Sequence, residues 1–270
     1  MHAEMATVAG NVSQANEDWV GVTPTAIAVL DGLTAPRDLD EPGCQHGVPW
    51  YVGQLGPALL ARLSDSTASL QDCLSSAIAD VAARHCFCDL TSPGAPQSTV
   101  ALVRVRGDEL EWLVLADSVI VVDLHGELRV ISDDRVERAA QVQRDDALRS
   151  PVGTAEHDQS VRRLIQQQRS VRNQPGGYWV AAADPAVAHE ALTGSAHLSK
   201  VRSVAVLSDG AARLVEFGLA GWDQVLSTLA EAGPQSLINE IRRVEATDLR
   251  GDHWPRYKTS DDATAVYARF

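Results

Sequence analysis

The chain has 270 residues, of which 45% are hydrophobic and 22% are charged, a balance typical of globular proteins and not of disordered chains. Its net charge of −13 disfavours nucleic acid as a partner, because proteins that bind nucleic acid usually present a basic face. No apolar run approaches the roughly 20 residues that cross a bilayer, and the N-terminus lacks a secretory pattern, so we expect a cytoplasmic protein without a membrane partner.

The N-terminal third is predicted to begin with strands and to continue with a pair of helices. Residues 4–12 and 19–31 have the character of two strands, and a loop rich in Pro and Gly follows at 32–50. Apolar residues then recur at helical spacing from Val52 to Leu63 and from Leu70 to Val81. Ser66 or Thr67 is suited to cap the second helix, and both apolar stripes are typical of helices that cover a sheet.

The rest of the chain alternates between runs of strands and pairs of helices. Short strands are predicted at 98–105, 110–116, 118–124 and 127–131, joined by turns that allow only antiparallel pairing. Residues 133–176 are polar and irregular, with one helix expected near 158–170. Strands at 178–183 and 202–208, helices near 219–230 and from Pro234, and a strand at 262–269 complete the order.

This order of elements predicts a fold of the α+β class. We expect a four-layer α-β-β-α sandwich, in which two mostly antiparallel sheets are flanked by helix pairs. No linker and no internal repeat divides the chain, so residues 1–270 are predicted to form one domain. Oligomeric state leaves no signal that we can interpret.

The four cysteines do not indicate a disulfide framework in a cytoplasmic chain of this size. His85-Cys86-Phe87-Cys88 carries metal-binding side chains. However, zinc sites usually contain Cys-x-x-Cys, and no second pair accompanies this one. We therefore expect buried or idle thiols, as free cysteines commonly are.

Acidic residues recur where predicted strands end. Asp31 and Asp209 each close an apolar run, and each is followed by a glycine that gives the backbone room to turn. Glu17 and Asp18 precede the first run, and Asp261 lies near the C-terminus. Each of these acids alone would be ordinary, since Asp-Gly is commonly a turn. Together they form a candidate site for the hard cations Mn²⁺ or Mg²⁺, which prefer carboxylate oxygens.

A pair of such cations can activate water for attack on a phosphoryl group, and this chemistry needs no nucleophilic side chain. The sequence contains neither a Gly-x-Ser-x-Gly nucleophile elbow nor a Gly-x-x-x-x-Gly-Lys phosphate loop. Serine hydrolases and nucleoside triphosphatases are therefore disfavoured, and metal-dependent phosphate hydrolysis remains.

Six short motifs follow one another along the chain: Asn16-Glu17-Asp18, Asp31-Gly32, Ser98-Thr99, Asp117-Ser118, Ser208-Asp209-Gly210 and Asp261-Asp262-Ala263-Thr264. Their order resembles that of the metal-dependent Ser/Thr protein phosphatases of type 2C, the PPM family, and the likeness runs from Asn16 to Val266. The resemblance implies hydrolysis of phosphoserine or phosphothreonine in proteins by metal-activated water, and the same four-layer fold. The implied partner is a phosphorylated protein, the substrate of a Ser/Thr kinase.

The resemblance also implies a site for two ions of Mn²⁺ or Mg²⁺, with a weaker third. Its metal-binding residues would be Glu17, Asp18, Asp31, Gly32, Asp117, Asp209 and Asp261. Asp31, Asp209 and Asp261 would share one ion, and Asp31 would bridge to the second. The second ion would also be coordinated by the Gly32 carbonyl and by either Glu17 or Asp18, directly or through water. Asp117 would contribute to the third ion. Asp31 and Asp209 are therefore the expected catalytic residues.

One departure from the family pattern concerns phosphate binding. The family usually carries an Arg four residues before the Glu of Asn-Glu-Asp, and this chain has Ser13 there. Arg is the preferred bidentate partner of phosphate, so its loss weakens substrate capture unless another residue such as Arg37 replaces it.

The departure leaves two alternatives open. The first is a catalytically weak or inactive pseudophosphatase that binds a phosphoprotein as a regulatory module. The second is a hydrolase of small phosphomonoesters. The retained carboxylates favour the enzyme, because clustered carboxylates repel one another without a cation.

Overall fold

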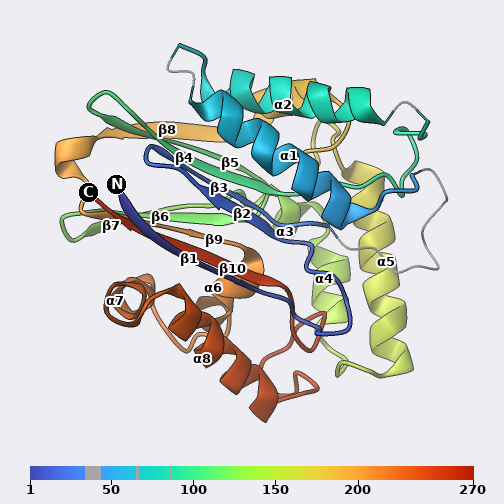
Figure 1. Ribbon diagram of the computed structural model, residues 1–270. Coiled ribbons are helices and arrows are strands. Elements are labelled where there is room, and N and C mark those ends of the chain that lie inside the picture. Colours follow the sequence, from blue (N-terminus) through green and yellow to red (C-terminus); the bar gives the residue numbers. More distant parts are fainter. Residues whose placement is uncertain (34–43, 65–66, 86) are drawn as a thin grey trace.

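Two five-stranded antiparallel sheets lie face to face between two layers of helices (Figure 1). The computed structural model describes residues 1–33, 44–64, 67–85 and 87–270. The α+β class and the predicted α-β-β-α sandwich are confirmed. Within the described ranges, every helix is too short or too polar to cross a membrane.

The first sheet joins the two ends of the chain. Its strand order is β1-β10-β9-β6-β7. β1 pairs with β10 from His2 opposite Arg269 to Val8 opposite Ala263, so the N- and C-terminal strands lie side by side (Figure 1). The strands are β1 (His2–Val8), β6 (Val119–Leu124), β7 (Glu127–Ile131), β9 (Ser203–Leu207) and β10 (Ala263–Arg269).

The second sheet has the order β2-β3-β4-β5-β8. It contains β2 (Trp19–Val22), β3 (Ala26–Leu30), β4 (Val100–Arg106), β5 (Glu109–Leu115) and β8 (Leu192–His197). The single strand predicted at 19–31 is wrong, because β2 and β3 form a hairpin. Its turn is closed by Thr23, whose backbone N–H donates to the carbonyl of Ala26 at 2.8 Å and whose hydroxyl accepts from the Ala26 N–H at 2.9 Å.

The central strands are apolar on both faces because each sheet is covered on both sides. In β3, Ile27 and Val29 pack between the two sheets, whereas Ala26, Ala28 and Leu30 face helices. Successive side chains of a strand point to opposite faces, so a strand between two layers is hydrophobic throughout. This explains why the apolar runs show no alternation, and the same packing fixes the positions of the strand ends.

Helices cover each outer face of the sandwich (Figure 1). The second sheet is covered by α1 (Val48–Leu63) and α2 (Leu70–Arg84), as their apolar stripes predicted. The cap of α2 is Ser69 and not Thr67, and the Ser69 hydroxyl accepts from the Asp72 N–H at 3.0 Å. Ser66, the other candidate, lies outside the described residues. The first sheet is covered by α6 (Asp209–Glu216), α7 (Trp222–Ala232) and α8 (Pro234–Thr247), of which α6 was not predicted.

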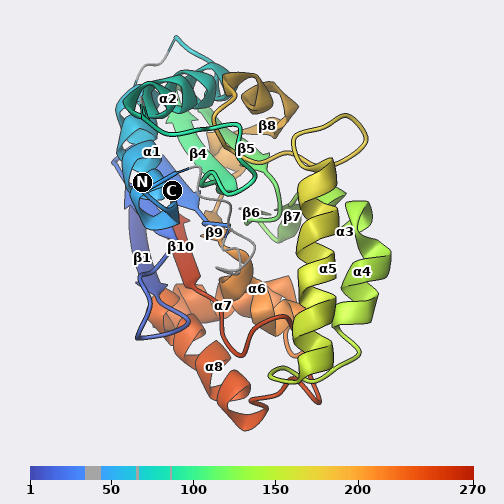
Figure 2. The same cartoon turned by 90° about the vertical axis from the view of Figure 1, so that its right-hand side faces the viewer.

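The segment 133–176 is more helical than predicted: the helix expected near 158–170 is present as the longest of three, and two short helices precede it. It forms α3 (Arg135–Ala139), α4 (Gln141–Ala147) and α5 (Ala155–Val171), which stand beside one end of the sandwich (Figure 2). The 3₁₀-helices η2 (Pro185–Glu190) and η3 (Leu198–Lys200) flank β8. The strand predicted at 178–183 reduces to isolated bridges, and β8 was missed because it is a polar edge strand.

Candidate metal centre

Carboxylates from both sheets converge at one end of the sandwich. Asp31 follows β3, Asp117 lies between β5 and β6, Asp209 opens α6 directly after β9, and Asp261 precedes β10. All four line a cavity of about 200 Å³, whose lining also includes Gly32. The stacked sheets therefore bring together residues that are far apart in the sequence, and we call these four aspartates the carboxylate wall.

The glycines after Asp31 and Asp209 are required by close backbone contacts. A Cβ on Gly210 would lie 1.9 Å from the carbonyl oxygen of Asp262, and one on Gly32 would lie 2.6 Å from that of Glu17. Neither neighbour is a flexible side chain, so no other residue fits without moving the backbone. The repeated Asp-Gly pair thus reflects how tightly the chain passes the strand ends.

Asp18 is the most deeply enclosed acid of the first motif, with 7% of its surface exposed. Its Oδ2 accepts a hydrogen bond at 2.9 Å from the Ser208 hydroxyl, which in turn accepts from the Thr264 N–H at 2.9 Å. Its Oδ1 is buried and has no hydrogen-bond partner among the described residues. Buried polar atoms are nearly always paired, so this oxygen is suited to a ligand.

Asp262 holds the loop that leads to Asp18. Its Oδ1 accepts from the Gly10 N–H at 2.8 Å, and its Oδ2 accepts from the Glu17 N–H at 2.6 Å. Sequence reasoning gave Asp262 no role, although its place beside Asp261 was visible. Its carboxylate positions the backbone of the first motif against the start of β10.

Burial and mutual repulsion raise the pKa values of several aspartates in the site. Burial, opposed by hydrogen bonds from Thr264 and Ser208, raises the pKa of Asp18 to about 7. Burial followed by repulsion from Asp209 raises the pKa of Asp117 to about 7. The pKa of Asp31 rises well above its usual value through burial and then repulsion from Asp209 and other aspartates, including Asp18.

Two cations offset part of this negative charge. Lys258 Nζ lies 2.8 Å from Asp261 Oδ1, and Arg213 Nη2 lies 3.5 Å from Asp261 Oδ2. Burial alone would raise the pKa of Asp261, but these two cations outweigh it and lower that pKa. Burial also raises the pKa of Asp209, and repulsion from Asp261 adds to it.

The donor set fits hard divalent cations. Fully ionised, the four aspartates of the carboxylate wall and Asp18 carry five negative charges, and Lys258 and Arg213 supply two positive ones. Three negative charges remain, and one oxygen of the set, Asp18 Oδ1, is buried without a hydrogen-bond partner among the described residues. Oxygen ligands with an excess of negative charge are what Mn²⁺ and Mg²⁺ select.

Another part of the cavity lining is basic and apolar. Arg169 and Arg172, near the C-terminal end of α5, line it together with Tyr178. Arg172 Nε donates to the Tyr178 hydroxyl at 2.8 Å, and its Nη1 donates to Gln97. We call Arg169 and Arg172 the arginine wall. Sequence reasoning missed both: Arg169 falls on the helix expected near 158–170, and Arg172 is the residue that follows α5.

The remaining predicted site residues lie elsewhere. Glu17, Asp18 and Ser13 are not among the described residues that line the cavity, although Asp18 is near enough to Asp31 for the two carboxylates to repel each other. Ser13 sits on an exposed turn, where its hydroxyl and N–H both donate to the side chain of Asn11. Arg37, considered as a replacement for the missing arginine, lies outside the described residues.

Ala116 holds an unusual backbone conformation directly before Asp117. Its φ of 71° lies in the left-handed region, which costs a residue with a Cβ about 1–2 kcal/mol. The carbonyl of Ala116 accepts from the Asp133 N–H at 3.2 Å, which ties this turn to the segment before α3. The strained turn places Asp117 at the cavity.

Comparison with known proteins identifies the fold. The model of the family "Protein phosphatase 2C" matches residues 12–242. The serine/threonine phosphatase PstP/Ppp of Mycobacterium tuberculosis is 17% identical, with a TM-score of 0.57 and coverage of 100% of this chain and 98% of that chain. Phosphatase Stp1 of Staphylococcus aureus is 13% identical, with a TM-score of 0.58 and coverage of 99% and 94%.

A further solved structure contains metal. The catalytic domain of PstP in complex with two manganese ions is 17% identical, with a TM-score of 0.55 and coverage of 99% of this chain and 97% of that chain. No curated protein sequence matches this chain. At such low identities the solved structures establish the fold, and the family model, which spans most of the sequence, establishes the relationship. The chain belongs to the protein phosphatase 2C family.

Proposed function

We propose that this protein is a metal-dependent phosphatase that hydrolyses phosphoserine or phosphothreonine in proteins. The observation that carries the proposal is a single cavity whose lining contains both the carboxylate wall and the arginine wall. The first can hold divalent cations, and the second can hold a phosphate dianion. Membership of the family and the manganese ions bound by PstP support this assignment.

The residues that would hold the metal are those of the carboxylate wall, with Asp18 and the Gly32 carbonyl beside them. When bound, Mn²⁺ or Mg²⁺ would neutralise phosphoryl oxygens and lower the pKa of a coordinated water. Asp31 would contribute to more than one ion, a role supported by its electrostatic repulsion with Asp209, Asp18, Asp261 and Asp117.

The chain itself supplies recognition and positioning. Arg169 and Arg172 offer donors to the non-bridging oxygens of the substrate, and Tyr178 and Gln97 hold the guanidinium of Arg172 in place. Leu164 and Ile165 of α5 give this side an apolar surface for the carbon atoms of the phosphorylated residue. The arginine wall thereby replaces the phosphate contact that Ser13 cannot make.

The described lining offers no activated side-chain nucleophile. Among its hydroxyl groups, that of Thr99 is buried and hydrogen-bonded to Ser118 Oγ at 2.6 Å. Burial raises the pKa of Tyr178 and of Tyr257, so neither phenol is ionised near neutral pH. Water is therefore the nucleophile that this cavity favours.

Hydrolysis assays test the proposal. A phosphothreonine peptide and para-nitrophenyl phosphate are incubated with the protein in Mn²⁺, in Mg²⁺ and in excess EDTA. We expect phosphate release that requires metal, with a higher kcat/KM for the peptide than for para-nitrophenyl phosphate. Faster turnover of the small ester alone would favour a hydrolase of small phosphomonoesters.

One observation favours a second candidate, the pseudophosphatase that binds phosphoproteins. Lys258 is 2.8 Å from Asp261 and so occupies an oxygen that a metal would use. Absence of turnover, combined with metal-dependent binding of the phosphopeptide in calorimetry, would establish this candidate and overturn the first. Lys258→Ala would then be expected to strengthen Mn²⁺ binding.

A further inference from the structure

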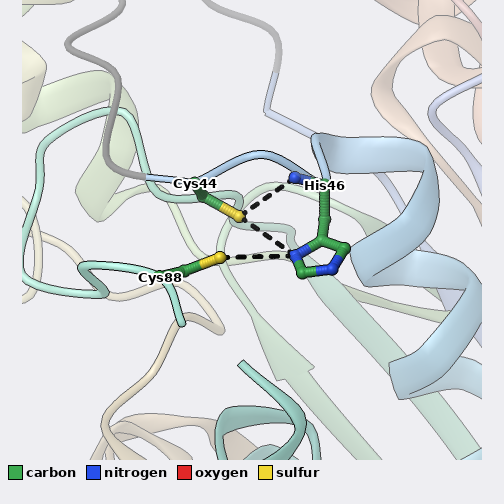
Figure 3. Close-up of side chains that lie close together, drawn as sticks. All are labelled: Cys44, His46 and Cys88. Carbon is green, nitrogen blue, oxygen red and sulfur yellow. Dashed lines mark hydrogen bonds between the residues drawn. The ribbon is translucent and has the colours of Figure 1, made fainter. Parts of the chain in front are cut away.

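A second group of metal-binding side chains lies away from the carboxylate wall. Cys44 and His46 precede α1, and Cys88 follows α2, so the group joins the two loops at the ends of this helix pair (Figure 3). One ligand atom from each residue lies within 4.8 Å of the other two. None of the three lines the cavity of the carboxylate wall.

The distances within this group suit a tetrahedral ion. His46 Nδ1 lies 3.7 Å from Cys44 Sγ and 3.4 Å from Cys88 Sγ. Zinc bound to sulfur at about 2.3 Å and to nitrogen at about 2.0–2.1 Å, with tetrahedral angles, places sulfur and nitrogen about 3.6 Å apart. The three ligand atoms therefore need little movement to share one zinc ion.

Hydrogen bonding alone explains the arrangement less well. Both sulfurs approach the same ring nitrogen, as Figure 3 shows. A neutral Nδ1 has a single lone pair and can accept from only one thiol. The backbone N–H of His46 also donates to Cys44 Sγ at 3.4 Å, and such a contact stabilises the thiolate that a metal requires.

The surroundings hold the histidine in place. The ring of His46 stacks on Trp50, with centroids 4.2 Å apart, and the ring of His85 meets both edge-on. His85 is 3% exposed, and its Nδ1 lies 3.1 Å from the carbonyl oxygen of Val81. Its Nε2 is buried without a hydrogen-bond partner among the described residues, so it is an acceptor that lacks a donor.

We propose that Cys44, His46 and Cys88 bind one Zn²⁺ ion, with water in the fourth position and His85 Nε2 as the acceptor for that water. Two thiolates and an imidazole select zinc over the hard cations of the carboxylate wall. The ion connects the chain that enters α1 to the loop that leaves α2. It thus fixes the downstream end of the segment that begins at Asp31 and Gly32.

Cobalt substitution of the full chain tests this proposal. The reduced, metal-free protein is titrated with Co²⁺ in excess Mg²⁺, and absorption is followed in the near ultraviolet and the visible. We expect a sulfur-to-cobalt charge-transfer band, because carboxylates cannot produce one, and we expect one equivalent of Zn²⁺ to abolish it. Cys44→Ser and Cys88→Ser should each lower zinc affinity by more than about 100-fold, the upper range for losing only a supporting contact.

Two further variants act as controls. Cys73→Ala removes a buried cysteine of α2 outside the group and should leave zinc affinity unchanged. His85→Phe keeps the ring packing but removes the acceptor, and it should lower affinity by about 10–100-fold. Circular dichroism checks that each variant is folded.

Cysteine alkylation tests the zinc site in the wild-type protein, so the result does not depend on whether a variant folds. Zinc should protect Cys44 and Cys88 from alkylation, as read by peptide mass spectrometry under native conditions. Absence of both the charge-transfer band and this protection would overturn the proposal. So would a Cys44–Cys88 disulfide that survives purification with mild reductant, because the same proximity would then serve a covalent link.

Discussion

The two walls of the cavity differ in charge and in how they are built. The carboxylate wall consists of residues at the ends of strands in both sheets, whose positions are fixed by the core between and outside the sheets. The arginine wall lies at the C-terminal end of α5, with Arg169 in its last turn and Arg172 directly after it. This helix packs beside the sandwich and mainly against α4 (Figure 2). The same cavity therefore combines a rigid half with a peripheral half.

This difference suggests a division of roles. Metal chemistry demands oxygen atoms at fixed separations, which strand ends provide. Phosphate recognition by long arginine side chains tolerates more movement, and a peripheral helix can supply it. Under the proposed function, Ser13 need not contact phosphate, because Arg169 and Arg172 would supply those contacts from another part of the fold.

Asp209→Asn changes the carboxylate wall and should have the largest effect on activity. The substitution keeps the shape of the side chain but removes a charge next to Asp31 and Asp261. We expect kcat/KM on a phosphothreonine peptide to fall about 10³-fold or more. Asp145→Asn, at an exposed site on α4, is the matched control. Retention of full activity in Asp209→Asn would remove the carboxylate wall from the mechanism.

Arg169→Ala and Arg172→Ala each remove one guanidinium group from the arginine wall. Each loses charge-assisted hydrogen bonds worth about 1.5–3 kcal/mol, so kcat/KM should fall about 10–150-fold while metal binding is unchanged. Arg162→Ala on the exposed face of the same helix controls for effects on α5 itself. Equal losses in all three variants would show that the helix matters only structurally.

The effect of pH on how much bound metal stabilises the fold tests the role of the carboxylates. The pKa values of Asp18 and Asp117 are about 7 in the fold, above their ordinary 3.8. In the metal-free protein, these two carboxyl groups lose their protons near pH 4 when the chain is unfolded and near pH 7 when it is folded. The free energy of unfolding therefore falls as pH rises from about 4 to about 7. Bound Mn²⁺ favours the ionised forms, and it should therefore raise Tm more at pH 8 than at pH 5.

The expected size of this effect follows from mass action. Mn²⁺ at about 100 times its Kd adds about 2.7 kcal/mol, which corresponds to a Tm increase of about 5–10 °C for a chain of this size. Differential scanning fluorimetry with and without EDTA gives the measurement. A larger increase at pH 5 than at pH 8 would contradict the assigned pKa directions.

Asp262→Asn should have the smallest effect. Asparagine retains one acceptor oxygen, so one of the two N–H groups, of Gly10 or Glu17, loses its partner. We expect a stability loss of about 1–2 kcal/mol in urea unfolding, with activity reduced less than in either arginine variant. A loss as large as that of Asp209→Asn would mean that Asp262 does more than position the loop.

The sequence predicted the rigid half well, for a physical reason. Strands buried on both faces are continuously apolar, and an Asp-Gly pair after such a run marks the point where the chain leaves the sheet. Order and spacing alone therefore grouped Asp31, Asp209 and Asp261. What the pattern could not indicate was Lys258 beside Asp261, since an ion pair depends on how the final loop folds back.

The peripheral half and the thiol group were harder to predict. The helix expected near 158–170 is α5, but the shorter α3 and α4 were not predicted, and the pattern did not indicate that Arg169 and Arg172 line the cavity. Cys44 and Cys88 belong to loops separated by the whole helix pair, and no fixed spacing connects them. Both features arise from packing of distant segments, which local pattern does not encode.

Anomalous diffraction from crystals grown with Mn²⁺ and phosphate tests the division of roles most directly. We expect manganese peaks among Asp31, Asp209 and Asp261, with a phosphate ion between these peaks and the guanidinium groups of Arg169 and Arg172. Manganese peaks with phosphate bound away from α5 would refute the role of the arginine wall. Absence of manganese from the carboxylate wall would contradict the central claim that this cavity is a metal-dependent phosphatase site.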